Sequence, residues 1–399
     1  MTTIDPTDEV IASGVEAEDS ALRRLLGAVA DWLTSTDHKK IGRLFLGGGL
    51  LGLLAAIVIN VIIGIERAGI ANIDDNALAQ IFDAQRGGLV FGTLLPLAIG
   101  LCVAIVPMQL GARSVAFPRL AAAGFWMWAG GLILSMIALV NNGGGLGGDP
   151  DMVDLFLGAH GLMAIGLAAT GVSIATSVLT TRAPGMTVRR VPFFSMSALV
   201  TGLGLVVVMP VLLGTLTYLF LDHRNGREAF GGNTGFYDWA GWIFSPGTVV
   251  LFAIPVAGLL AEGAPLLFKQ RTPARGIVFA GFGLMGVAAL GAVTQDAIHN
   301  VPWAGSELYL GGGEDVREKL FDVLPWAMFN LLPLLGLTIV LLMTLFLARP
   351  VKGAKPTVTP ALAFGFLGLG MIMVGMIGTA LHAIDDLGLQ DTVFAEGAL

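Results

Sequence analysis

Residues 44–65 read LFLGGGLLGLLAAIVINVIIGI, and this stretch decides the fold class of the chain. It runs for 22 residues without a charged side chain. A transmembrane helix needs about 20 consecutive apolar residues to cross a hydrocarbon core about 30 Å thick. A helix is the expected form because lipid offers no hydrogen-bond partner to an open backbone. The stretch therefore predicts a membrane-spanning helix.

Further stretches of similar length and composition follow, so we expect about nine spans. They are Leu44–Ile65, Leu89–Met108, Leu120–Val140, Leu155–Leu179, Phe193–Leu221, Trp239–Phe268, Ile277–Ala297, Leu324–Leu347 and Leu362–Leu381. The sixth contains Pro246 and Pro255, which predict a kink or a shortened membrane portion. The predicted fold class is an all-α, polytopic membrane helix bundle of about nine transmembrane helices.

Composition supports this class and narrows the partners. The 399 residues are 55% hydrophobic and only 13% charged, whereas soluble domains carry about 25% charged residues. The lipid bilayer is therefore the first predicted partner. The net charge of −7 argues against nucleic acid as a partner, because its phosphates attract basic proteins. The single cysteine, Cys102, excludes an internal disulfide or a cysteine metal cluster.

Polarity and charge predict four regions and an orientation. Residues 1–17 are expected to be a disordered cytoplasmic tail, 18–40 an interfacial amphipathic helix and the segment leading into the first span, 41–386 the bundle, and 387–399 an outer-side tail. One set of loops is richer in basic residues, which predicts that it faces the cytoplasm. Its eleven are Arg113, Arg119, Arg182, Arg189, Arg190, Lys269, Arg271, Arg275, Arg349, Lys352 and Lys355, against six on the other side: Arg67, Arg86, Arg224, Arg227, Arg317 and Lys319. We therefore expect a multi-pass protein of a bacterial-type inner (plasma) membrane, with its N-terminus cytoplasmic and its C-terminus outside.

Several motifs lie in the loops between the predicted spans. The predicted cytoplasmic side carries Thr36-Asp37-His38-Lys39, Gly111-Ala112-Arg113-Ser114-Val115-Ala116-Phe117-Pro118-Arg119-Leu120 and Arg182-Ala183-Pro184-Gly185-Met186-Thr187, and the outer side carries Asp222, Arg224 and Asn225. From about Trp32 to Thr392, their order and spacing resemble subunit I of the haem-copper respiratory oxidases, the cytochrome c oxidase subunit I family. The resemblance implies the first nine helices of that subunit. It also implies haem and copper chemistry, if the ligands are present.

The resemblance places the metal ligands at positions that carry other residues here. The family needs six histidine ligands, and this chain has five histidines in all. Arg86 matches a ligand of the low-spin haem, and arginine offers iron no lone pair. Pro246 and Asn300 match copper ligands, which leaves His299 as the remaining candidate at the copper position. The first of a final pair of haem ligands would fall near Ala398, and the second after the last residue.

The positions that move protons in the family are also changed. Thr248 and Val250 stand where the resemblance implies a glutamate and a tyrosine, and Ser114 stands for an acidic residue. No lysine or arginine lies between Leu324 and Leu347, where the family carries a lysine. Proton transfer is therefore not expected. His160 is interpreted as a hydrogen-bonded packing residue, although His160, His299 and His382 could form a metal site at the outer side.

Three functions remain open. The first is a redox-inactive, oxidase subunit I-like membrane protein, with no catalytic residue and no cofactor, that acts as a structural or accessory subunit with other membrane subunits of a respiratory-type complex. The second is an active haem-copper oxidase subunit with non-standard or partner-supplied ligands, which alone would bind haem and copper. The third is a transporter or channel, with the predicted kink at Pro246 as a candidate opening.

Overall fold

A computed structural model of the chain describes residues 23, 26–27, 30–70, 72–227, 229–244, 246–272, 274–289, 324, 326–346, 349–350 and 359–382. Within these ranges nearly all regular structure is helical. The strands form two short antiparallel pairs, β1 (Gly143–Gly144) with β2 (Gly147–Gly148) and β3 (Gln270–Arg271) with β4 (Arg349–Pro350). The predicted all-α fold class is confirmed. The tails predicted at 1–17 and 387–399 lie outside the described residues.

Among the described residues, six helices are long and apolar enough to cross a membrane. They are α2 (His38–Arg67), α3 (Asp75–Gly87) continued by the π-turn η1 (Gly88–Leu94) and α4 (Leu95–Leu110), α5 (Pro118–Val140), α6 (Pro150–Thr180), α7 (Phe193–Arg224), and α8 (Phe236–Ala240) continued by the 3₁₀ turn η4 (Gly241–Phe244) and α9 (Pro246–Leu267). Shorter apolar helical segments lie where the last three spans are predicted. They are α10 (Arg275–Gly286), α13 (Leu332–Leu341) between the π-turns η5 (Ala327–Leu331) and η6 (Leu342–Phe346), and α14 (Pro360–His382).

Two local features differ from the predicted spans. The second begins 14 residues before Leu89, because the side chain of Asp74 caps α3 by accepting from the Asn76 N–H. The glycine-rich segment between the third and fourth predicted spans forms a hairpin of β1 (Gly143–Gly144) and β2 (Gly147–Gly148). Gly147 and Gly148 have φ of 100° and 128°, a region that favours glycine.

The sixth predicted span is interrupted where the prolines indicate. The helix changes to a 3₁₀ turn at Gly241–Phe244, and α9 begins at Pro246. Proline suits the first helical position because its missing N–H would have no partner there.

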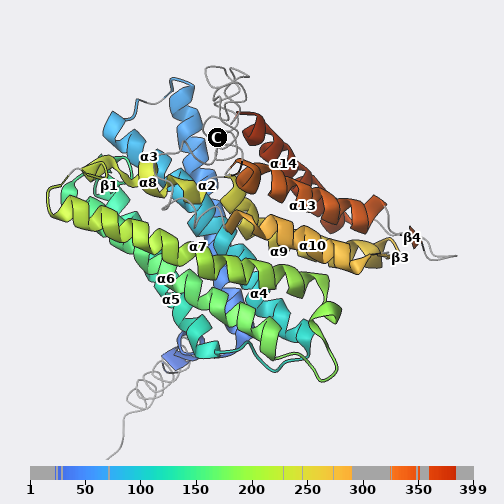
Figure 1. Cartoon of the computed structure of the whole chain (residues 1–399). Coiled ribbons are helices and arrows are strands. Elements are labelled where there is room, and N and C mark those ends of the chain that lie inside the picture. The colour runs from blue at the N-terminus through green and yellow to red at the C-terminus, as the bar shows by residue number, and fades with distance from the viewer. Residues whose placement is uncertain are drawn as a thin grey trace, which may run out of the picture.

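Small residues let the helices approach closely. On α2, a Cβ at Gly52 would lie 2.0 Å from the Gly92 carbonyl oxygen. On α5, a Cβ at Gly124 would lie 2.2 Å from Thr170 Oγ1 of α6. In Figure 1, α5 packs against α6, and α6 packs against α7. The helices α10, α13 and α14 lie on another side of the bundle. This dense packing of small residues is typical of membrane bundles.

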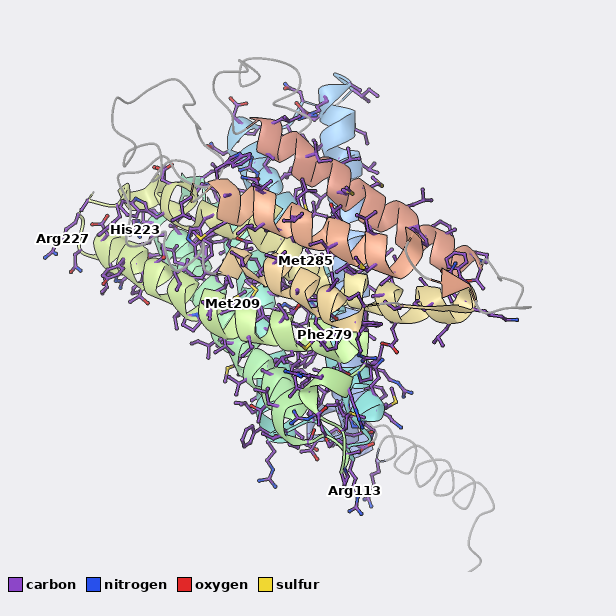
Figure 2. The ribbon with its side chains drawn as sticks, turned by 45° about the vertical axis from the view of Figure 1, so that its right-hand side comes forward. Arg113, Met209, His223, Arg227, Phe279 and Met285 are labelled. Carbon is purple, nitrogen blue, oxygen red and sulfur yellow. The ribbon has the colours of Figure 1, made fainter. Side chains whose placement is uncertain are left out.

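The bundle has two different ends. The hairpin end holds the β1–β2 hairpin, the N-terminus of α3 and α8, which lie near one another in Figure 1. The motif end holds the loops 111–117 and 181–192. Figure 2 shows Arg113 at the motif end and His223 and Arg227 at the opposite end. Between the ends, many large apolar side chains of α2 are exposed, including Leu51 and Val58, as expected for a surface facing lipid.

Candidate functional site

Arg86, which replaces the implied haem ligand, lies near the end of α3. Its guanidinium carbon is 5.2 Å from the centroid of the Tyr237 ring, which α8 supplies. A guanidinium over an aromatic face is attracted by the negative face of the ring. Arg86 is thus held by a neighbouring helix at the hairpin end.

Tyr237 in turn contacts a buried carboxylate. Its hydroxyl donates to Asp83 Oδ1 at 2.5 Å. The other oxygen, Asp83 Oδ2, accepts from the backbone N–H of Leu146 at 3.1 Å, and the N–H of Gly145 also donates to this carboxylate. Asp83 is only 2% exposed, and a buried charge is tolerated only when hydrogen bonds replace its water.

Gln80, one turn before Asp83, ties the same helix to the hairpin. Its Nε2 donates to the Gly147 carbonyl at 3.1 Å and to Asn142 Oδ1 at 3.4 Å. A Cβ at Gly144 would lie 2.3 Å from Gln80 Oε1 and 2.4 Å from Asp83 Oδ2, so this close approach requires glycine. We call Gln80, Asp83, Arg86, Tyr237 and the hairpin residues that they contact the Asp83 cluster.

His160 lies beneath this cluster on α6 and is enclosed by aromatic rings. Its Nδ1 is 2.9 Å from the Phe156 carbonyl oxygen. The neighbouring ring centroids belong to Phe156 at 4.2 Å, Phe91 at 5.4 Å and Phe236 at 5.5 Å. His160 is 2% exposed, which agrees with the prediction of a hydrogen-bonded packing residue.

The space beside His160 is small. A cavity that contacts Asp83, Gly87, Ser135 and His160 has a volume of about 10 Å³. That volume suits about one water molecule, whereas pockets for organic ligands typically measure about 300–1,000 Å³. Aromatic side chains therefore fill the interior next to His160.

The positions implied for copper and protons are only partly described. Pro246 is the first residue of α9, the Thr248 hydroxyl donates to the Trp242 carbonyl at 3.1 Å, and Val250 is a buried core residue. His299, Asn300 and Ala398 lie outside the described residues, as does the side chain of His382. In the described part of the chain, no three His, Cys, Asp or Glu side chains come close enough to hold a metal ion.

A polar cluster that the sequence analysis missed joins α6 to α7 at the hairpin end. His223 Nδ1 lies 2.7 Å from Asp154 Oδ1, and Arg224 donates to Asp154 Oδ2 at 2.9 Å. The signal was an acidic residue directly before one predicted span and two basic residues shortly after the end of the next. Antiparallel neighbours bring such ends together, with each charge favoured by its helix dipole.

A second polar residue that the sequence analysis did not single out is Glu262. It is half-buried on α9, and its Oε2 accepts from the Phe193 N–H at 2.6 Å, at the start of α7. Glu262 therefore supplies an acceptor to a helix start whose own N-cap, Pro192, has no side-chain hydrogen bond.

The retained motifs hold the loops at the motif end. The Ala116 N–H donates to Ser177 Oγ at 2.7 Å, and the Ser173 hydroxyl donates to the Ala116 carbonyl. The Ala183 N–H donates to the Leu110 carbonyl at 2.9 Å, which joins the loop 181–192 to the end of α4. These motif residues stabilise connections between helices.

The fold and its apolar exposed surface define a multi-pass integral membrane protein. The family described as Cytochrome C and Quinol oxidase polypeptide I matches residues 40–303. The chain belongs to this family.

Similar bacterial proteins support the assignment. Cytochrome c oxidase subunit 1 of Bacillus subtilis (strain 168) is 30% identical over 60% of this chain and 42% of its own length. The probable cytochrome c oxidase subunit 1 of Bradyrhizobium diazoefficiens is 28% identical over 72% of this chain and 45% of its own. Cytochrome bo(3) ubiquinol oxidase subunit 1 of Buchnera aphidicola subsp. Schizaphis graminum is 31% identical over 60% and 40%, respectively. The chain thus spans less than half the length of these relatives, and it is a multi-pass protein of a bacterial-type plasma membrane.

Proposed function

We propose that this chain is a redox-inactive relative of oxidase subunit I that serves as a structural or accessory subunit of a respiratory-type membrane complex. In this proposal it binds no haem or copper, and its N-terminus is cytoplasmic. The observation that carries the proposal is Arg86, at the implied haem-ligand position, with its guanidinium over the ring of Tyr237.

The described residues do not fit a haem at this position. Iron requires a ligand with a lone pair, and the guanidinium of Arg86 stays protonated and only donates. A large planar group beside Arg86 would also have to displace Tyr237, whose hydroxyl is bonded to the buried Asp83. If the buried Asp83 carboxylate lost this donor, the folded protein would be less stable by about 1–3 kcal/mol.

The retained features support a structural role. The motif loops still hold neighbouring helices together, as the bonds of Ala116 and Ala183 show. Small residues on the helices permit close packing, which is also how membrane subunits associate. A bundle of this kind buries surface against lipid and partner subunits without needing a redox centre.

A pyridine haemochrome assay and a reduced-minus-oxidised spectrum of the purified full-length chain test the absence of haem. We expect no stoichiometric haem signal, and none after Arg86→His, because the rings around His160 still fill the interior. Subunit 1 from Bacillus subtilis, purified in the same way, is the positive control. A stoichiometric haem signal in the unmodified chain would contradict the proposal and favour an active oxidase with partner-supplied ligands.

Native mass spectrometry of gently solubilised membranes tests the accessory role separately. We expect the chain in assemblies whose mass includes other membrane subunits. If it is found only as a free chain under conditions that keep a known oxidase intact, the accessory role is wrong even if haem is absent.

A further inference from the structure

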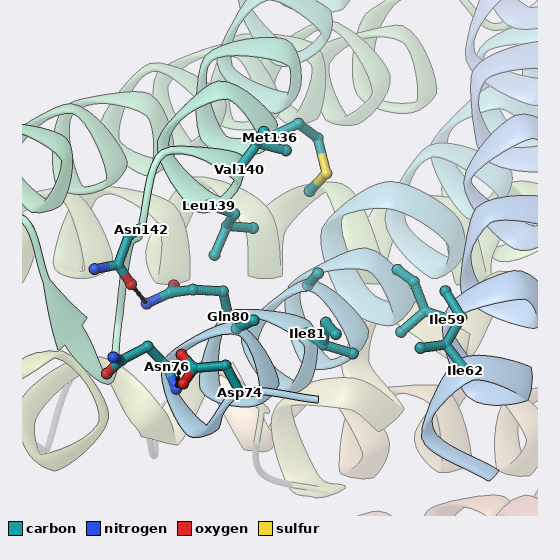
Figure 3. A pocket seen from close by; sticks show the side chains of 12 residues that line it. Ile59, Ile62, Asp74, Asn76, Gln80, Ile81, Met136, Leu139, Val140 and Asn142 are labelled. Atoms are coloured by element: carbon teal, nitrogen blue, oxygen red, sulfur yellow. Dashed lines mark hydrogen bonds between the residues drawn. The ribbon is translucent and has the colours of Figure 1, made fainter. Parts of the chain in front are cut away.

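The surface between α2, α3 and α5 is hollowed near the hairpin end (Figure 3). The hollow has a volume of about 590 Å³, which lies in the range of ligand pockets, about 300–1,000 Å³. Most of its walls are apolar. The apolar lining residues are Ile59, Ile62, Ala77, Ile81, Ala84, Met136, Leu139 and Val140.

The rim of the hollow is polar and acidic. It consists of Asp74, Asn76, Gln80 and Asn142, and Figure 3 shows the bonds from Gln80 to Asn142 and from Asn76 to Asp74. Asp74 is exposed, and no lysine or arginine of the described residues forms an ion pair with it. An occupant with a cation and a hydrogen-bond acceptor in its head group would complement this rim.

The length of the hollow along the helices matches the part of a lipid that includes the head group and the start of the acyl chains. Asn142 follows the end of α5, and Met136 lies six residues earlier, so the α5 wall is about 9 Å long at 1.5 Å rise per residue. On α2, Ile59 lies eight residues before the end of the helix at Arg67, or about 12 Å. The polar rim is therefore at the helix ends and the apolar walls lie further into the bilayer.

A second hollow of about 410 Å³ adjoins the first and shares Met136 and Val140 with it. Its other lining residues are Leu132, Ile133, Ile137 and Asn141. Two apolar hollows on either side of the same α5 side chains suit a molecule with two tails. A single-tailed amphiphile would fill only one of them.

We propose that these hollows bind one zwitterionic aminophospholipid, of the phosphatidylethanolamine class, independently of the proposed function. Its ammonium group lies against Asp74, its phosphate and ester oxygens accept from the amides of Asn76 and Asn142, and its acyl chains lie on either side of Met136 and Val140. The carboxylate of Asp74 at the rim repels an anionic head group, so phosphatidylglycerol binds less well.

Native mass spectrometry of the full-length chain in detergent tests this site. The added probes are palmitoyl-oleoyl-phosphatidylethanolamine, the phosphatidylglycerol with the same chains, and decylubiquinone. We expect one phosphatidylethanolamine to be retained in preference to phosphatidylglycerol. Asp74→Asn keeps the helix cap, because asparagine caps as well as aspartate, and it should weaken retention about two- to fivefold, the value of an exposed charge pair.

Matched variants separate the site from general lipid adhesion. Asp75→Asn removes the same charge one residue away and should leave retention unchanged. Ala77→Trp fills the hollow and should abolish selective retention. Gly158→Trp fills a different apolar hollow of about 360 Å³ between α6 and α7 and should not. Equal retention of both phospholipids, an equal effect of Asp74→Asn and Asp75→Asn, or preferential retention of decylubiquinone would each overturn the proposal.

Discussion

Asp83 is the residue on which the hairpin end depends. Its carboxylate accepts from a side chain of α8 and from the backbone of the β1–β2 hairpin, so one buried charge joins three segments. A charge in the interior is stabilising only as long as its hydrogen-bond partners are complete. Each of these partners should therefore contribute measurably to stability.

Tyr237→Phe removes the hydroxyl that donates to Asp83 at 2.5 Å and leaves the ring in place. We expect a loss of about 1–3 kcal/mol in the free energy of unfolding, because a buried carboxylate loses a donor. Denaturant unfolding in detergent micelles measures it. The matched control is Tyr218→Phe, since Tyr218 is 63% exposed. If the two variants unfold alike, Asp83 does not depend on Tyr237.

At the residue scale, the sequence indicated which residues stand at the implied ligand positions, but it did not predict what their side chains contact. Arg86 could be assigned to the implied haem-ligand position because a motif gives the register. The bond between Asp83 and Tyr237 joins residues 154 positions apart, and no local pattern brings them together. The contact arises only when α8 packs over α3, which is a property of the tertiary fold.

At the element scale, close helix packing depends on particular glycines. Gly52→Ala would place a Cβ 2.0 Å from the Gly92 carbonyl oxygen, so α2 must move away from η1. We expect a loss of about 1–3 kcal/mol in stability, as for other overpacked cores. Gly47→Ala on the same helix meets no atom within 4 Å. This control should be neutral or stabilising by up to about 1 kcal/mol, and equal losses in both variants would contradict the packing argument.

The spans were predictable because a run of apolar residues is a local signal, and α2 extends beyond the predicted stretch by only a few residues at each end. Helix α3 was missed since it buries polar side chains, Gln80 and Asp83, and so lacks an apolar run. The β1–β2 hairpin was missed because glycine is compatible with both a flexible turn and a strand. Its conformation is fixed by bonds to α3, which are distant in sequence.

At the scale of the whole molecule, the motif end and the hairpin end differ in how closely they follow the pattern that the family resemblance implies. The motif end keeps its sequence motifs, and those residues make the loop contacts that fix neighbouring helices. The hairpin end carries Arg86, at the haem-ligand position that the resemblance implies, and a cluster built around Asp83.

The excess of basic residues in the loops of the motif end predicts that this end faces the cytoplasm. Cys102 is completely buried, so a membrane-impermeant maleimide should report only on introduced cysteines. Leu146→Cys places one on the exposed side of the hairpin, and Arg189→Cys places one in an exposed motif-end loop. We expect Leu146→Cys to be labelled in intact spheroplasts and Arg189→Cys only in inverted vesicles, with both labelled in detergent as the control. The reverse pattern would show that the charge asymmetry does not set the topology, and it would place the Asp83 cluster and the proposed lipid site in the cytoplasmic leaflet.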